Sequence, residues 1–230
     1  MLEQMEDHIE EGTSLINCSS ISLQAPNFSI RCSGEFENFT KWPIIFQSCD
    51  IKHGSVNVPF RTILPATREG FAIHKYPYSY HGCWVKCHFK IGSAGSYLHV
   101  MISQPFSYVN NRRNYLSINI SDQPEVTFDS LWENRKECIS RNSCFVFACN
   151  VDVCVEGHIG MGPKPLIDIR IRPLKYQCLS QPMKIFGDNH DEIFFETYQD
   201  YLKNKFIDHK NEFFNKILTK IKFGSAQSGE

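Results

Sequence analysis

The chain has 230 residues, of which 42% are apolar and 13% are aromatic, and its net charge is −1 at pH 7. This much apolar material can fill a sizeable core, so the composition excludes an intrinsically disordered protein. The near-neutral charge argues against a general nucleic-acid binder, because such proteins carry a basic excess. The chain contains no run of eighteen apolar residues, and we therefore expect no membrane span and no membrane partner.

The chain begins with an acidic stretch and continues as a long series of strand-like runs. Residues 1–12 are polar and acidic, and we expect them to be a disordered N-terminus. Across residues 13–189, short runs rich in Val, Ile, Phe and Tyr alternate apolar and polar positions, and turn residues separate them. The clearest runs are WPIIFQSC, SVNVPF, CWVKCHFKI, SYLHVMIS, NYLSINIS, CFVFAC and PLIDIRIR. A period of two predicts a mostly β domain, an immunoglobulin-like Greek-key β-sandwich.

One of these runs, CFVFAC, ends in a cysteine that a second cysteine follows five positions later. Alternation along the strand places Cys144 and Ala148 on one face and Phe145, Phe147 and Cys149 on the other. The two faces of the run therefore have different neighbours, and Cys149 points away from the face that carries Ala148.

The pattern changes after the last strand-like run. Residues 190–223 contain no Gly or Pro, and apolar residues such as Phe194, Tyr198 and Tyr201 recur at helical spacing. This segment is predicted to be a C-terminal amphipathic helix. Its apolar stripe either packs on the sandwich or joins copies of the chain into a homo-oligomer. Residues 224–230 are expected to be a disordered tail.

Two clusters of potential metal ligands lie far apart in the chain. The segment HGCWVKCH contributes Cys83, Cys87 and His88, and the segment CNVDVC contributes Cys149 and Cys154. Zinc prefers four thiolate or imidazole ligands, and two distant pairs suit a clip that joins two long loops of a fold with its own core. The same cysteines are equally typical of buried thiols or of disulfides, and the residues alone leave these three interpretations open.

The cysteine count and the sequons bear on the cellular location. Ten cysteines, together with N-x-Ser/Thr sequons at Asn17, Asn27, Asn38 and Asn119, favour a secreted, glycosylated, disulfide-bonded ectodomain. The acidic start lacks the basic and apolar regions of a signal peptide, which favours a reducing nuclear or cytoplasmic location. Motifs of hydrolases, phosphate-binding loops and metalloproteases are missing from the sequence, and we expect no enzyme.

Four segments together resemble the DNA-binding β-sandwich of the p-fifty-three family of tumour-suppressor transcription factors. The segment TKWPIIF (40–46) is similar to the family's K-T-C-P-V-Q-L strand, and YVNNRRNY (108–115) is similar to its Y-L-D-D-R-N-T-F hairpin. FVFACN (145–150) resembles the end of the family's Y-N-Y-M-C-N-S-S-C segment, and PLIDI (165–169) resembles its P-I-L-T-I strand. The order and rough separations of these segments agree, over residues 14–187.

The resemblance implies one structural zinc ion. In that family a C-x-x-x-C pair and a C-x-x-H pair hold the metal between two large loops. Cys149 and Cys154 match the first pair with one extra residue between them, and Cys83 with either Cys87 or His88 is the best match to the second. The large loops of the sandwich would then be clipped together by zinc.

The resemblance also implies a function, namely sequence-specific binding of double-stranded DNA by a nuclear transcription factor. Lys164 lies where the family's minor-groove loop would be, and Lys184 is placed to contact phosphate, with Arg170 and Arg172 assisting. Asp188 stands where the family reads guanine with an arginine, and this change favours an alternative. In that alternative the sandwich binds protein partners and has lost base readout.

Overall fold

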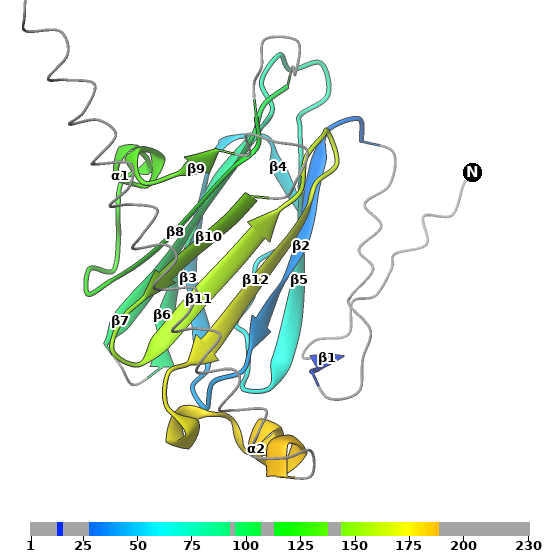
Figure 1. The fold of residues 1–230 in the computed structure, drawn as a ribbon. Coiled ribbons are helices and arrows are strands. Elements are labelled where there is room, and N and C mark those ends of the chain that lie inside the picture. Colours follow the sequence, from blue (N-terminus) through cyan, green and yellow to red (C-terminus); the bar gives the residue numbers. More distant parts are fainter. Residues whose placement is uncertain (1–12, 16–27, 93–94, 107–112, 138–143, 189–230) are drawn as a thin grey trace, which may run out of the picture. The chain divides into compact units, whose positions relative to one another are not determined.

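The computed structural model describes residues 13–15, 28–92, 95–106, 113–137 and 144–188. Most of these residues lie in strands, which confirms the prediction of a mostly β chain (Figure 1). The chain divides into two compact units, Met1–Lys184 and Ile185–Glu230, and the sheets belong to the first. The predicted N-terminal stretch 1–12, the helical segment 190–223 and the tail 224–230 lie outside the described residues.

Seven strands form the larger sheet. They run in the order β1-β5-β2-β12-β11-β10, and β4 also pairs with β5. Neighbours are antiparallel except β12 and β2, which run parallel. The strands are β1 (Thr13–Ser14), β2 (Arg31–Asn38), β4 (Ser55–Val58), β5 (Thr67–His74), β10 (Cys144–Cys149), β11 (Val153–Ile159) and β12 (Leu166–Pro173). The immunoglobulin-like Greek-key connectivity stays a prediction.

Five antiparallel strands form the second sheet, in the order β3-β6-β7-β8-β9, so that β3 is an edge strand. They are β3 (Ile44–His53), β6 (Cys83–Ile91), β7 (Ser96–Gln104), β8 (Tyr115–Ser121) and β9 (Lys136–Glu137). The helical elements are α1 (Phe128–Glu133), the 3-10 helix η2 (Tyr176–Cys178) and α2 (Gln181–Asp188). None of the helices in the described ranges combines the length and the apolar character required to cross a membrane.

The core lies between the two sheets, because each contributes the apolar side chains of its inward face. Phe36 of β2 is central to it: its ring centroid lies 5.4 Å from that of Phe71 on the neighbouring strand and 5.1 Å from that of Phe89 on the other sheet. Val146 and Ala148 face the same core, so the predicted alternation along the CFVFAC run is confirmed. The period of two in the sequence therefore reports the two faces of real strands.

One predicted glycosylation position, Asn38 at the end of β2, has a structural role. The side chain is fully buried, and its amide donates hydrogen bonds to the carbonyl oxygens of Trp42 (2.7 Å) and Ile63 (3.1 Å). Its oxygen accepts from the backbone N–H of Thr40 (3.0 Å). An amide nitrogen occupied in this way inside the fold is not a site for a surface glycan, so this sequon does not support glycosylation.

We expect Gly34→Ala to destabilise the sandwich by about 2 kcal/mol, because the parallel pairing of β2 and β12 leaves no space for a methyl group. A Cβ at Gly34 would lie 2.4 Å from the carbonyl oxygen of Ile167 and 2.9 Å from the Phe71 ring. Urea unfolding measures the loss. Gly160→Ala is the matched control, since its Cβ would have no neighbour closer than 3.5 Å. Equal stability of the two variants would contradict this account of the β2–β12 pairing.

Candidate functional site

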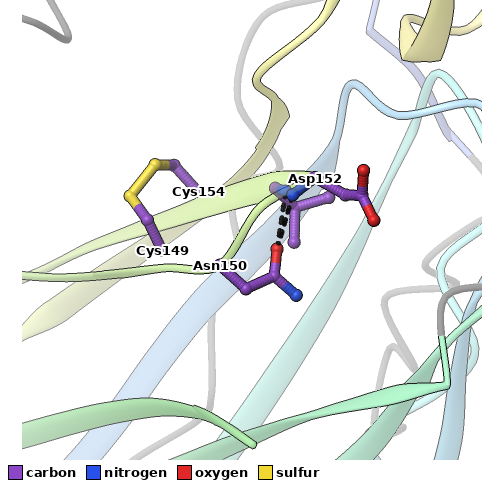
Figure 2. Close-up of a disulfide and its surroundings, with 5 residues drawn as sticks. Cys149, Asn150, Asp152 and Cys154 are labelled. Atoms are coloured by element: carbon purple, nitrogen blue, oxygen red, sulfur yellow. Dashed lines mark hydrogen bonds between the residues drawn. A yellow bond between two sulfur atoms is a disulfide. The ribbon is translucent and has the colours of Figure 1, made fainter.

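The cysteines predicted as one half of a zinc site form a disulfide instead. Cys149 and Cys154 are opposite each other in the β10–β11 hairpin, and their sulfur atoms are bonded (Figure 2). Between them, the Asn150 side-chain oxygen accepts hydrogen bonds from the backbone N–H groups of Asp152 and Val153, both at 2.9 Å. Zinc binds thiolates, and a sulfur in a disulfide is not one, so the zinc assignment of Cys149 and Cys154 was wrong.

The other predicted ligands lie on two different faces of β6. Cys83 and Cys87 point into the core between the sheets, whereas His88 follows on the opposite face. Neighbouring residues in a strand cannot converge on one ion, because their side chains leave the backbone in opposite directions. In the part of the chain that the structure describes, no group of three or more His, Cys, Asp or Glu side chains is arranged to hold a metal. The predicted zinc cofactor is therefore rejected.

The residues predicted to contact DNA are mostly engaged within the protein. Arg170 pairs with Glu37 at 2.8 Å and with Asp168 at 2.6 Å. Arg172 forms an ion pair with Glu156 at 3.0 Å. The Lys184 ammonium lies 3.5 Å from the carbonyl oxygen of Gln177. Lys164 is exposed in the connection before β12. Lys164 and Lys184 lie beyond opposite ends of β12. The structure does not bring these residues together into a basic surface.

His88 has another partner, the buried His99 of β7. Their Nδ1 atoms lie 2.5 Å apart, and His88 Nε2 has no hydrogen-bond partner among the described residues. Burial lowers the pKa of His88, Lys86 lowers it further, and Asp50 and Glu125 raise it. Burial first, and then the His88 ring, lower the pKa of His99 to about 4. Both rings are therefore held neutral near pH 7, and one Nδ1 donates its proton to the other.

Acid should destabilise the fold through this pair. A histidine titrates near 6.5 when unfolded, so the unfolded chain takes up protons from that pH downward while His99 resists to about pH 4. Stability is complete above about pH 6.5 and falls as the pH drops through this window, by roughly 2 kcal/mol between pH 7 and pH 5. Urea unfolding at both pH values measures the fall, and His99→Gln should flatten it. An unchanged pH dependence in His99→Gln would rule out the pair as its source.

A different part of the molecule has the features of a binding surface. The connection between β5 and β6 reads KYPYSYHG, residues 75–82, and we refer to it as the tyrosine loop. Its side chains point to solvent: Tyr78 is 99% exposed, Tyr80 85% and Tyr76 52%. Phe106, just after β7, is 37% exposed, and its ring meets that of Tyr80 edge to face at 6.4 Å. Clustered exposed rings of this kind mark interaction surfaces.

The tyrosine loop is held in shape by Lys75. Its ammonium donates hydrogen bonds to the carbonyl oxygens of Tyr76 (3.1 Å) and Ser79 (2.8 Å) and lies 4.8 Å from the centre of the Phe106 ring. Tyr78 has a φ of +61°, which is unusual for a residue with a side chain and turns this ring outward from the tight turn. The loop thus presents its rings on an ordered backbone.

The tyrosine loop lies at the same end of the sandwich as the β11–β12 connection (Figure 1). At Gly82 a side chain would overlap the backbone of Gln104 and Pro105, so the loop packs directly on the end of β7. The Gln104 amide donates to the carbonyl oxygen of Gly162 at 3.4 Å, which ties the β11–β12 connection to the same strand end. We call this end, made of residues 75–82, 104–106, 113–114 and 160–165, the aromatic end.

The aromatic end is basic as well as aromatic. Its residues include Lys75, Arg113 and Lys164, and the four segments that define it contain no Asp or Glu. Met161, in the β11–β12 connection, adds an apolar side chain that is 42% exposed. A surface that combines rings, an apolar side chain and positive charge suits a partner with apolar and anionic parts.

Sequence reasoning missed the tyrosine loop. The predicted strands and site residues include none of residues 61–82, the segment between the runs SVNVPF and CWVKCHFKI. The sequence did contain an indication of this loop, the three tyrosines of YPYSY. Three rings so close together in a turn cannot all be buried in the core. Only Lys164 of the predicted site residues belongs to the aromatic end.

Comparisons with known proteins give no support to the family inferred from the sequence. No protein-family model matches the chain. The chain is 25% identical over 139 residues to Tereporin-Ca1 of Terebra anilis, an alignment that covers 56% of this chain and 72% of that protein. It is 27% identical over 120 residues to Tereporin-Ts1 of Terebra subulata, with coverage of 52% and 57%.

A solved structure has a similar fold. The lipid binding protein Nakanori superposes with a TM-score of 0.53 at 10% sequence identity, over 64% of this chain and 72% of that one, and at this identity the likeness concerns the fold alone. Nothing in these comparisons points to the p-fifty-three family, and the inferred membership, transcription-factor function and DNA binding were wrong. Two of the segments that suggested it, 145–150 and 165–169, lie almost wholly in β10 and β12, and strand alternation of this kind is common to many sandwiches. By sequence and by fold, this chain is similar to tereporins and to a lipid-binding β protein.

Proposed function

We propose that the protein binds lipid and docks on membrane surfaces through its aromatic end. The observation that carries the proposal is the set of exposed rings at one end of a rigid sandwich, in four segments that also hold three Lys or Arg residues and no Asp or Glu. In this proposal the protein is a binding protein and not an enzyme. It replaces the expectation of a DNA partner and of no membrane contact.

The chemistry of these side chains fits the boundary between water and hydrocarbon. Tyrosine has an apolar ring and a polar hydroxyl, and such rings gather at the headgroup level of membranes. Tyr78 and Tyr80 present almost their whole surface, so they can enter that layer without any change in the fold. Lys164 and Arg113 at the same end supply the positive charge that attracts lipid phosphates.

The comparisons support a membrane-directed function. The sequence relatives carry the name tereporin, and the fold neighbour Nakanori is a lipid binding protein. We extend the proposal to permeabilisation of the bound membrane, which this chain would bring about after docking. The Cys149–Cys154 disulfide favours an oxidising compartment, so we propose secretion in place of the nuclear or cytoplasmic location.

Co-sedimentation of the full chain with vesicles tests the proposal. We expect the protein to pellet with vesicles of phosphatidylcholine, and more strongly when phosphatidylserine is added at low salt, because the aromatic end is basic. Release of an entrapped dye from the same vesicles reports permeabilisation separately. If the protein stays in the supernatant with every vesicle composition, the proposed lipid binding is wrong; binding without dye release would remove only the extension.

A further inference from the structure

Two cysteines outside the known disulfide lie side by side in the second sheet. Cys49 of the edge strand β3 is the register partner of Cys87 of β6, and their sulfur atoms are 3.3 Å apart. Both side chains lie on the core side of the sheet, where Cys87 is fully buried and Cys49 is partly buried. No intervening atom separates the two thiols.

The backbone around Cys49 has room for the small movement that a bond requires. Opposite residues in antiparallel strands have Cβ atoms about 4.5–5.5 Å apart, and a disulfide needs about 3.5–4.5 Å. The β3–β6 register shifts between Phe46 and Ser48, and again between Ile51 and His53, so irregular pairing flanks Cys49 on both sides. β3 is at the edge of its sheet in the described residues, and past Phe46, which donates to the Thr62 hydroxyl, β6 is its strand neighbour.

The two thiols differ in the way that disulfide exchange requires. Cys87 donates its S–H to Cys49, and this hydrogen bond lowers the pKa of Cys49. Burial, followed by the same hydrogen bond, raises the pKa of Cys87. Cys49 is thus the more acidic and the more accessible thiol, and Cys87 is the buried resolving thiol. Two other described thiols are less suited: burial raises the pKa of Cys83 to about 12, and Cys32 donates to Gln104 at 3.1 Å.

We propose that Cys49 and Cys87 form a second disulfide, which closes by exchange with an exogenous small-molecule disulfide such as oxidised glutathione. The Cys49 thiolate attacks one sulfur of the small disulfide, whose S–S bond breaks and releases one thiol. Cys87 loses its proton and attacks the Cys49 sulfur of the mixed disulfide, which expels the second thiol. Two protein thiols are oxidised to one disulfide, and the small disulfide is reduced to two thiols.

The bond would fix the edge strand of the second sheet. β3 continues past Cys49 to Lys52 and His53. The Lys52 ammonium lies 3.9 Å from the centre of the Trp84 ring, and the His53 ring stacks on that of His81, at the base of the tyrosine loop, with ring centres 4.2 Å apart. A covalent link between β3 and β6 therefore stabilises the strand pair from which the loop begins. The inference holds whether or not the aromatic end binds lipid, and its test does not involve membranes.

Peptide mapping of the full chain tests this inference. The reduced, folded protein is incubated with oxidised glutathione, then unfolded and alkylated, digested without reductant and analysed by mass spectrometry. We expect a peptide containing Cys49 joined to one containing Cys87, and a midpoint of thermal unfolding several degrees above that of the reduced protein. Cys178→Ser, which lies outside the core between the sheets, is the control and should keep the cross-link. Cys49→Ser should lose the cross-link and still fold, since Cys49 is only partly buried.

Two results would overturn the inference. In the first, Cys49 retains glutathione as a stable mixed disulfide, which would mean that Cys87 cannot reach it. In the second, both cysteines are alkylated in the oxidised protein after unfolding, which would mean that the pair does not react. Because Cys87→Ser removes a fully buried thiol and can prevent folding, the Cys49→Ser variant and the wild-type map decide the question.

Discussion

Replacing Tyr78 and Tyr80 together by serine should weaken vesicle binding by about a hundredfold. Each tyrosine ring offers roughly 150–250 Å² of surface, and burying even part of it in the interface contributes about 1.4 kcal/mol, a factor of about ten. The two side chains are 99% and 85% exposed, so their removal takes nothing from the core. Co-sedimentation over a range of lipid concentrations measures the change in the partition coefficient.

Tyr176→Ser is the matched control for the double variant. Tyr176 is also an exposed tyrosine, at 41%, but it lies in η2, which follows β12, and not in any segment of the aromatic end. It should bind vesicles as the wild type does, and all variants should unfold at the same temperature. An equal loss in Tyr176→Ser, or no loss in the double variant, would show that the tyrosine loop is not the membrane contact.

Several strands of the sandwich were accessible to sequence reasoning, although β2, β5 and β11 match none of the predicted runs. The runs CWVKCHFKI and CFVFAC coincide with β6 and β10, and SYLHVMIS lies within β7. Alternation worked here because each strand has one face on a core, and burial on one side imposes the period of two. The assignment of faces around Ala148 was correct for the same reason.

The role of the cysteines was not accessible in this way. The spacing of Cys149 and Cys154 is compatible with a metal pair and with a disulfide across a hairpin, and only the register of β10 and β11 distinguishes them. Likewise, Cys49 and Cys87 are neighbours because β3 pairs with β6, and local sequence patterns do not predict which strands pair. The resemblance to a known sandwich favoured the zinc interpretation. That resemblance was misleading, because the matching segments share strand alternation and not a common ancestor.

A charged network on the larger sheet is a second feature that depends on long-range register. β2 lies between β5 and β12, so Glu37 receives Arg68 from one neighbour at 3.0 Å and Arg170 from the other at 2.8 Å. The side chains of Arg68 and Glu37 are only 7% and 8% exposed. The buried Glu37 carboxylate is stabilised by the two guanidinium groups, and each guanidinium is stabilised by the carboxylate.

Glu37→Gln should therefore destabilise the protein by about 3 kcal/mol, because the buried Arg68 guanidinium loses its nearest carboxylate and keeps only Glu35, at 3.7 Å. Urea unfolding at pH 7 measures the loss. Lys175→Ala removes an exposed pair with Asp152, at 3.3 Å, and should cost less than about 1 kcal/mol. Replacing Glu37 and Arg68 together by leucine should restore part of the stability, since the poorly compensated Arg68 charge is then gone. If the double variant is no more stable than Glu37→Gln, the loss comes from packing around β2 and not from the charge of Arg68.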